Sequence, residues 1–469
     1  MYITESTQPI LIALLVAYVL IILLYSYYFY RKTNTYESYN MGGRAMPLIP
    51  MILTIIGAAV GGSTVLGFMT DAYQFGLGQV WLVVSLALAL SIFTLFFCKA
   101  HSHSRGQAAL LSRLCCTTLR KCREVPRFHR EHRRSWSSHR SQFVALATVL
   151  NLIFGLDMTV GIIVSCIIIT LKTYLGGLTA VIWTDAIQGT IQTLGILTMF
   201  LFVYYYTGGW DNVVSNVETS PVIANDYLQM FNMPLAEFLM PFATIGAAML
   251  VRQDTWQRVW AARNLSTTLK ANWVAVILMF VTGLMIIIIG VMARAGLGIE
   301  TDRPDLIYYD VIFGALPFWL SALMFITLVA IIMSCADSFF IAGSTIMVSD
   351  IIKPVFNITD DKKLLSVSRL MVIAMTIFSL SLALLIPRLV ELWMTGSAIL
   401  VAGLFAPILI GLFWSRPDKV AGLASMWTGL ILAVSWQLLG HPFGIHPVFI
   451  GLPLSLLVLL VLSFRKKAA

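Results

Sequence analysis

The sequence predicts an all-α polytopic membrane protein, and three observations indicate this fold class. Of the 469 residues, 59% are hydrophobic and 11% are charged, whereas soluble domains carry about 25% charged residues. Apolar stretches of about 20 residues, the length that a helix needs to cross a bilayer, recur along the whole chain. The loops between them alternate between basic and acidic. We therefore expect one membrane domain embedded in a lipid bilayer, with no nucleic-acid partner.

The apolar stretches predict about thirteen transmembrane helices. The first, residues 8–30, has no basic residues before it and is followed by Arg31 and Lys32. We therefore interpret it as a retained helix rather than a secretory signal. The others are expected at 47–70, 78–97, a damaged stretch that ends near 154, 157–175, 180–207, 237–256, 270–293, 315–349, 366–387, 390–414, 418–438 and 446–464.

The charges of the loops predict the orientation of the chain. One set of loops holds most of the Lys and Arg, and the other holds acids such as Asp211 and Glu300. Because cytoplasmic loops carry an excess of Lys and Arg, we expect the basic loops to be cytoplasmic. The N-terminus then lies outside and the C-terminus in the cytoplasm, in a plasma membrane of the bacterial inner-membrane type. The basic set includes Arg31, Lys32, Arg44, Arg258, Arg263, Lys270, Lys353, Lys362, Lys363, Arg416 and Lys419.

Residues 98–142 depart from this pattern. They hold eleven Lys or Arg, two Glu and five of the seven histidines, so their charge equals the +9 of the whole chain. Three interpretations compete: a shifted reading frame or an equivalent sequence error, a basic loop that contacts anionic lipid, and a zinc site. We favour the first, because this composition begins and ends abruptly and 143–156 resembles half of a helix. The zinc site would use Cys115, Cys116, Cys122, His129, His132 and His139, whose spacing matches no standard ligand pattern.

Two predicted helices are interrupted by small residues at corresponding places. Gly57, Gly61 and Gly62 lie in the second stretch, and each glycine weakens a helix by about 1 kcal/mol relative to alanine. The tetrapeptide IGAA occurs at 56–59 and again at 245–248. Close helix packing also explains small residues, but interruptions in both halves are typical of inverted-repeat transporters.

This pattern predicts two five-helix halves. The expected divisions are an extra N-terminal helix and cytoplasmic loop (1–46), a first repeat (47–207, including the aberrant 98–142), an outside loop (208–236), a second repeat (237–414) and two additional C-terminal helices (415–469).

Ser334, Asp337 and Ser338 form a polar cluster inside an apolar stretch. Their spacing of i, i+3 and i+4 places all three on one helical face. A carboxylate at this depth is costly and normally pairs with a cation or a donor. Hydroxyl and carboxylate oxygens are hard ligands that suit Na⁺ or a proton, and unwound carbonyls near Gly57 and Val60 could complete the site. Alternatively, the serines bond back to their own helix and Asp337 pairs with a buried donor.

A second polar cluster lies at 181–192, where Asp185, Gln188 and Gln192 share a helical face. The simpler interpretation is a helix start, with Thr184 as the N-cap and Asp185 in the favourable first turn. Spacing alone slightly favours that simpler interpretation.

Four motifs resemble a known family in order and spacing. They are YNMGGRAMP (39–47), YLGGLTAVIWTDAIQ (174–188), WQRVWAARN (256–264) and SCADSFFIAGSTIMVSDI (334–351). The chain resembles the sodium/solute symporters, which include the proline permease and bacterial sugar and sialic acid symporters, over nearly its whole length except 98–142. The resemblance implies the five-plus-five inverted-repeat fold of the amino-acid transporter LeuT and Na⁺-driven solute import by alternating access, with Na⁺ as coupling ion and no other metal or cofactor.

The resemblance also implies a sodium site. Its ligands would be the carbonyls of Gly57, Val60 and Ile331 and the side chains of Ser334 and Cys335. The family usually has two hydroxyls at the last two positions, and a thiol is a poorer ligand for Na⁺, so the affinity and the identity of the ion stay open. Asp185 matches the family's aspartate near this site, and in members with a second sodium the residues matching Asp185, Ser334, Asp337 and Ser338 form it.

The solute is expected at the membrane midplane, between the interrupted helices. Small and apolar residues are expected to line it, which favours a small, compact solute over a sugar. The expected lining is Gly61, Gly62, Ser63 and Thr64, facing Thr244, Ile245, Ala248 and Met249.

Other functions fit the sequence less well. A channel needs a pore lined by several subunits and a selectivity filter. An intramembrane enzyme needs clustered catalytic groups, and outside 98–142 the only histidines are His441 and His446. A proton-coupled or ion-independent solute transporter, or a solute sensor on the same fold, stays open, as does the oligomeric state.

Overall fold

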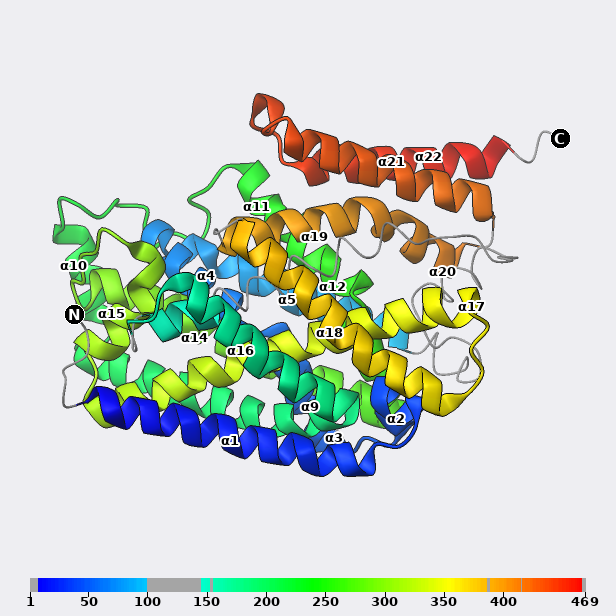
Figure 1. Cartoon of the computed structure of the whole chain (residues 1–469). Helices are drawn as coiled ribbons and strands as arrows, with labels where there is room; N and C mark the ends of the chain where they lie inside the picture. The colour runs from blue at the N-terminus through cyan, green and yellow to red at the C-terminus, as the bar shows by residue number, and fades with distance from the viewer. Residues whose placement is uncertain (1–6, 99–144, 152–154, 386–388, 415, 466–469) are drawn as a thin grey trace.

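The computed structural model describes residues 7–98, 145–151, 155–385, 389–414 and 416–465, and its described elements are helices (Figure 1). The longer ones are α1 (Gln8–Lys32), α3 (Leu48–Ala59), α4 (Gly62–Phe75), α5 (Val80–Ile92), α9 (Met158–Tyr206), α14 (Leu265–Ala295), α16 (Phe318–Ile346), α18 (Asp361–Leu385), α19 (Leu389–Phe405), α21 (Lys419–Leu438) and α22 (Pro447–Arg465). The shorter ones are α2 (Tyr36–Met41), α10 (Trp210–Thr219), α11 (Leu235–Pro241), α12 (Ala247–Val251), α13 (Gln253–Ala261), α15 (Ile307–Gly314), α17 (Lys353–Val355) and α20 (Gly411–Phe413).

Nine helices in the described part of the chain are long and apolar enough to cross a membrane, or up to ten if a bent pair is one span. The number of thirteen therefore stays a prediction. The aberrant stretch 98–142 lies outside the described residues from position 99 onward. Of the damaged stretch that ends near 154, the structure describes residues 145–151, which are helical.

The helix α9 folds back on itself at Gly177. A straight helix of 49 residues would be about 74 Å long, more than twice the thickness of a bilayer core. Lys172 and Gln188 would lie about 24 Å apart along such a helix, yet the Lys172 ammonium donates to Gln188 Oε1 at 3.0 Å. Gly177 adopts φ +62° and ψ −171°, a conformation open to glycine. The predicted stretches 157–175 and 180–207 are thus the two arms of α9.

The two predicted interruptions are present. Between α3 and α4 the chain leaves the helical conformation at Val60 and Gly61, and the first IGAA ends α3. In the second half, a π-helical turn at Phe242–Gly246 leads into α12, and the chain then bends by 41° at Arg252 before α13. The second IGAA spans the π-helical turn and the start of α12.

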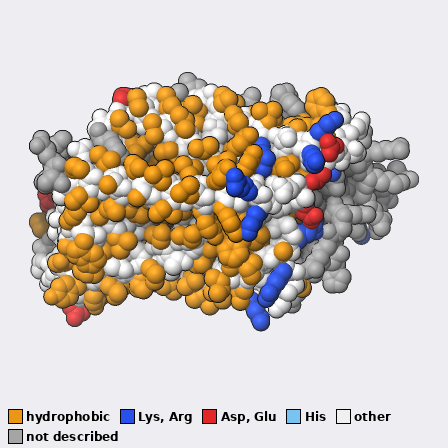
Figure 2. Space-filling view, turned by 60° about the horizontal axis from the view of Figure 1, so that its bottom comes forward, with side chains coloured by type: hydrophobic (Ala, Val, Ile, Leu, Met, Phe, Trp, Pro, Cys, Tyr) orange, Lys and Arg blue, Asp and Glu red, His pale blue; other side chains and the backbone are white. Residues whose placement is uncertain are grey.

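The outside of the molecule suits a bilayer. Figure 2 shows a broad field of hydrophobic side chains, with Lys and Arg gathered toward one end. On α1, Ile21 and Leu24 expose 61% and 68% of their surface, as lipid-facing residues do. In Figure 1, α1 runs along one side of the molecule, and α21 and α22 lie together on the opposite side.

The most enclosed long helix is α16. Within its apolar window 78% of residues are buried, compared with 28% for α1. It packs against α9, α18, α3 and α13. This arrangement brings the polar face of α16 against the break between α3 and α4.

Candidate ion and solute site

The Asp185 carboxylate forms the centre of a buried polar cluster. Ser334 Oγ donates to Asp185 Oδ1 at 2.6 Å, and Thr54 Oγ1 donates to Asp185 Oδ2 at 2.6 Å. All three side chains are fully buried. They come from α9, α16 and α3, so the fold joins residues that are far apart in the sequence. Because Asp185 lies well inside the second arm of α9, the interpretation of Thr184 as a helix N-cap is wrong.

The broken helix lies directly beside this carboxylate. A Cβ atom at Gly57 would lie 2.5 Å from Ser334 Oγ and 3.8 Å from Asp185 Cγ, so only glycine leaves room there. The carbonyl oxygen of Val60 accepts a bond from Gln192 Nε2 at 3.3 Å. The Cys335 thiol lies 3.8 Å from the carbonyl oxygen of Ala58. Gly57, Ser334 and Asp185 therefore meet as expected, with Val60 and Cys335 at the same helix break.

Arg258 enters this cluster, although the loop charges predicted that it lies in the cytoplasm. Its guanidinium is 3% exposed and donates to Ser338 Oγ at 2.6 Å and to the Thr54 carbonyl at 3.1 Å. It also lies 3.5 Å from Asp185 Oδ2. The expected position was wrong because α13 folds inward after the bend at Arg252. The available signal was the motif at 256–264, in which Arg258 lies two positions from Trp256 on one side and Trp260 on the other.

Asp337 belongs to a different cluster on the same helix. It forms an ion pair with the Lys172 ammonium and accepts a bond from Thr173 Oγ1 at 2.6 Å. Ser338 Oγ bonds back to the Ser334 carbonyl at 3.1 Å. The second set predicted for sodium is thus divided: Asp185 and Ser334 lie together, Ser338 contacts Arg258, and Asp337 contacts Lys172. Sequence reasoning did not use Lys172, although a lysine inside the apolar stretch 157–175 is a signal that could have found it.

A second pair of charges fixes the bend between α12 and α13. Arg252 donates to both carboxylate oxygens of Asp254, at 3.0 and 2.7 Å. Its guanidinium also lies 3.4 Å from the Ala58 carbonyl and 4.8 Å from the ring centre of Phe339. These contacts tie the bend in the second half to the break in the first half.

The predicted solute-lining residues are buried. Met249 lines a small cavity with Ala58, Ala59 and Asp254, whose volume of about 10 Å³ suits at most one water molecule. Ala248 packs instead against Ala398 and Val401. Ile331, which was predicted as a sodium ligand and not as a lining residue, is fully buried one turn before Ser334. The remaining members, Gly61, Gly62, Ser63, Thr64, Thr244 and Ile245, lie on or next to α4 and on the π-helical turn.

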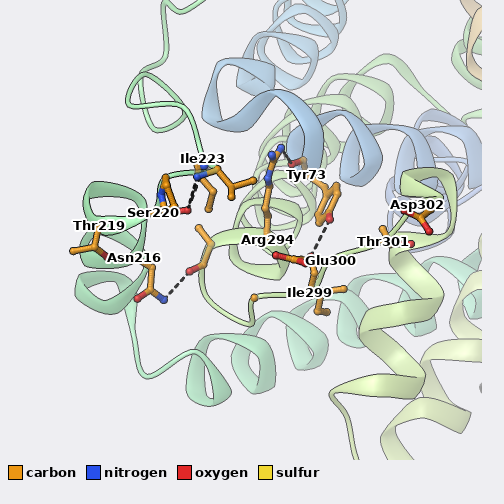
Figure 3. Close-up of a pocket in the computed structure, with 14 residues that line it drawn as sticks. Tyr73, Asn216, Thr219, Ser220, Ile223, Arg294, Ile299, Glu300, Thr301 and Asp302 are labelled. Atoms are coloured by element: carbon orange, nitrogen blue, oxygen red, sulfur yellow. Dashed lines mark hydrogen bonds between the residues drawn. The ribbon is translucent and has the colours of Figure 1, made fainter.

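A larger pocket lies at one end of the molecule (Figure 3). Its volume is about 880 Å³, and its lining includes Tyr73, Arg294 and Glu300. Arg294 Nη1 donates to the carbonyls of Tyr73 and Gln74 at 3.2 and 3.0 Å. None of the predicted solute-lining residues lines this pocket.

Interrupted membrane helices around buried oxygen ligands define a secondary active transporter. The sequence profile of the sodium:solute symporter family matches residues 135–429, more than half of the chain. The chain therefore belongs to the sodium:solute symporter family, as its motifs predict. Its relatives are transporters rather than enzymes.

Relatives match over nearly the whole chain. The sodium/pantothenate symporter of Escherichia coli is 27% identical, covering 95% of each chain. The high-affinity proline transporter PutP of Bacillus subtilis is 22% identical, covering 95% of this chain and 96% of its own. The human high affinity choline transporter 1 is 24% identical over 92% of this chain and 77% of its own.

Solved structures show the same fold. A Na⁺-coupled sialic acid symporter in a substrate-bound outward-open state matches with a TM-score of 0.80 at 17% identity, covering 97% of both chains. MhsT in complex with L-phenylalanine matches with a TM-score of 0.54 at 11% identity, covering 90% of this chain and 99% of its own. The predicted LeuT-like, all-α architecture is confirmed.

Proposed function

We propose that this chain is a Na⁺-coupled secondary active transporter that imports one small organic solute by alternating access. The observation that carries the proposal is the meeting of Asp185, Ser334 and Gly57 at the break between α3 and α4. A buried carboxylate with a hydroxyl and backbone carbonyls at a helix break supplies the hard oxygen ligands that suit Na⁺.

The proposed Na⁺ ligands are the carbonyls of Gly57, Val60 and Ile331, with the hydroxyl of Ser334. Asp185 supplies the negative charge next to them, because its Oδ1 already accepts a bond from Ser334. Cys335 occupies the remaining position, where sulfur is a weaker ligand than a hydroxyl oxygen. Coupling to a proton in place of Na⁺ is the alternative that the test below separates.

The solute class follows from the residues around the interrupted helices. The predicted lining is small and apolar, with hydroxyls from Ser63, Thr64 and Thr244. Such a lining suits a compact solute, and relatives are named for proline, pantothenate and choline. Alternating access then requires the two predicted repeats, 47–207 and 237–414, to move relative to each other.

Thermal unfolding of purified protein in Na⁺ and in K⁺ at equal ionic strength tests the ion site. An ion at 100 times its Kd stabilises the bound state by about 2.7 kcal/mol. We expect a Na⁺-specific rise in Tm that is lost in Ser334→Ala. The matched control is Ser344→Ala, because Ser344 is an equally buried serine on α16 that bonds to the Ile341 carbonyl of its own helix.

Uptake of labelled proline, pantothenate and choline into proteoliposomes then identifies the solute class. We expect uptake of one of them to require an inward Na⁺ gradient and to be abolished in Asp185→Asn. Equal Tm values in Na⁺ and K⁺, together with uptake that follows a pH gradient, would show that the chain is proton-coupled instead.

A further inference from the structure

Lys172 is a lysine buried inside an apolar membrane helix. Its side chain is 1% exposed, and it lies in the first arm of α9. Burial of an ammonium ion inside a membrane is costly unless an opposite charge accompanies it. Asp337 on α16, itself fully buried, supplies that charge.

The Lys172–Asp337 pair is held by hydrogen bonds from three helices. The ammonium also donates to Gln188 Oε1 at 3.0 Å, and the Gln188 amide donates to Tyr18 OH on α1 at 2.6 Å. Thr173 Oγ1 donates to Asp337 Oδ1 at 2.6 Å. Charged groups with satisfied partners keep a fixed geometry. The ammonium is therefore a permanent part of this site.

The carboxylates of Asp337 and Asp185 are neutralised by different cations. Asp337 has a dedicated cation, the Lys172 ammonium. Among the described residues, the ion-pair partner of Asp185 is the more distant Arg258 at 3.5 Å, and that guanidinium is shared with Ser338, Thr54 and the Asp254 carbonyl. Asp185 therefore keeps a carboxylate oxygen that faces Ser334 and the helix break, where a mobile cation can bind.

Asp337 with the hydroxyls beside it would, without Lys172, form a cation site of its own. The Asp337 carboxylate, the Thr173 hydroxyl that donates to it and the Gln188 oxygen that now accepts from Lys172 are hard oxygen ligands. An ammonium ion and Na⁺ compete for the same carboxylate, because both are held by charge and by oxygen contacts.

We propose that the Lys172 ammonium takes the place of a second coupling cation at Asp337, so that this chain binds one Na⁺ per transport cycle, at the Asp185 site. This inference rests on the proposed function and adds the ion stoichiometry to it. Lys172 stays paired with Asp337 in every conformation of the transport cycle. Only the Asp185 site binds and releases an ion.

Direct Na⁺ binding to purified protein tests the inference. With radioactive Na⁺ as the probe, the unaltered chain should bind one Na⁺ per chain, with a Hill coefficient of one. Lys172→Met leaves the Asp337 carboxylate without its cation and should bind a second Na⁺, doubling the number of bound ions and raising the Hill coefficient above one. The double variant Lys172→Met with Asp337→Asn removes both charges and should again bind one.

The controls separate this inference from the proposed function. Lys363→Met, which removes an exposed lysine, should leave the count at one. Two Na⁺ bound by the unaltered chain, or one Na⁺ bound by folded Lys172→Met, would overturn the inference while the proposed function stands. If the unaltered chain bound no Na⁺, the proposed function would fail and the inference with it. If Lys172→Met does not fold, Lys172→Gln replaces it as the variant without the ammonium, and one Na⁺ bound by folded Lys172→Gln would overturn the inference.

Discussion

Gly57 determines how closely Ser334 and Asp185 approach the broken helix. A methyl group at this position would lie 2.5 Å from Ser334 Oγ, closer than atoms can pack. We expect Gly57→Ala to push Ser334 away from Asp185 and to weaken Na⁺ binding by about tenfold or more, which corresponds to about 1.4 kcal/mol. The Na⁺ dependence of Tm measures this loss.

Gly314→Ala is the control for that substitution. Gly314 has no heavy atom within 4 Å of the position of an added Cβ. An equal loss of Na⁺ response in both variants would show that helix stability, rather than the approach of Ser334, is responsible.

Cys335 is the position at which the proposed Na⁺ site has its poorest ligand. Replacing its thiol by the hydroxyl of Cys335→Ser supplies a harder oxygen donor beside the Ala58 carbonyl. We expect the affinity for Na⁺ to rise by about threefold to tenfold. Cys166→Ser, at a buried cysteine in the first arm of α9, should leave the affinity unchanged. An unchanged Na⁺ affinity in Cys335→Ser would exclude residue 335 from the ligand set.

At the scale of the element, the fold-back of α9 positions the Asp185 carboxylate and the Lys172 ammonium that pairs with Asp337. The turn at Gly177 lets Lys172, in the first arm, reach Gln188 in the second. It also packs against Tyr39, because a Cβ at Gly177 would lie 2.5 Å from the tyrosine ring. One glycine therefore controls the geometry of two polar clusters.

Gly177→Ala should destabilise the protein. The conformation at φ +62° and ψ −171° costs a residue with a Cβ about 1–3 kcal/mol, and the contact with Tyr39 adds to this cost. A lowered Tm and lowered resistance to denaturant would measure the effect. Gly298→Ala is the control, because Gly298 also has φ +62° but has no heavy atom within 4 Å of an added Cβ; an equal loss there would show that the Tyr39 contact contributes nothing.

At the scale of the whole molecule, basic and acidic residues lie on different exposed segments, as the positive-inside rule expects of a membrane protein. The N-terminal end of α18 carries exposed Lys362 and Lys363, whereas the loop after α14 carries exposed Glu300 and Asp302. Figure 2 shows a broad apolar surface with Lys and Arg gathered toward one end of it. The positive-inside rule then predicts which end is cytoplasmic.

Labelling of single cysteines in intact bacterial cells tests this orientation. We expect Glu300→Cys to react with a membrane-impermeant reagent from outside, and Lys363→Cys to react only after the cells are opened. The unaltered chain corrects for its six native cysteines. The reverse pattern of labelling would invert the proposed topology.

The sequence alone determined the class of this protein. Composition and apolar stretches of bilayer length indicate a polytopic helical protein, and glycines at 57, 61 and 62 mark the broken helix. These are local signals, because membrane solvation and helix propensity act on neighbouring residues. The motif resemblance identified the family and brought Asp185 and Ser334 into one candidate site.

Only the tertiary structure decided which charges meet. Lys172 and Asp337 are 165 positions apart and pair because α9 folds back beside α16. Arg258 appeared to be a loop residue until the bend at Arg252 carried it into the core. Such pairs leave no periodic pattern, since Coulomb attraction depends on distance in space and not along the chain. The structure therefore divided one predicted cation cluster into two parts, Asp185 with Ser334 and Asp337 with Lys172.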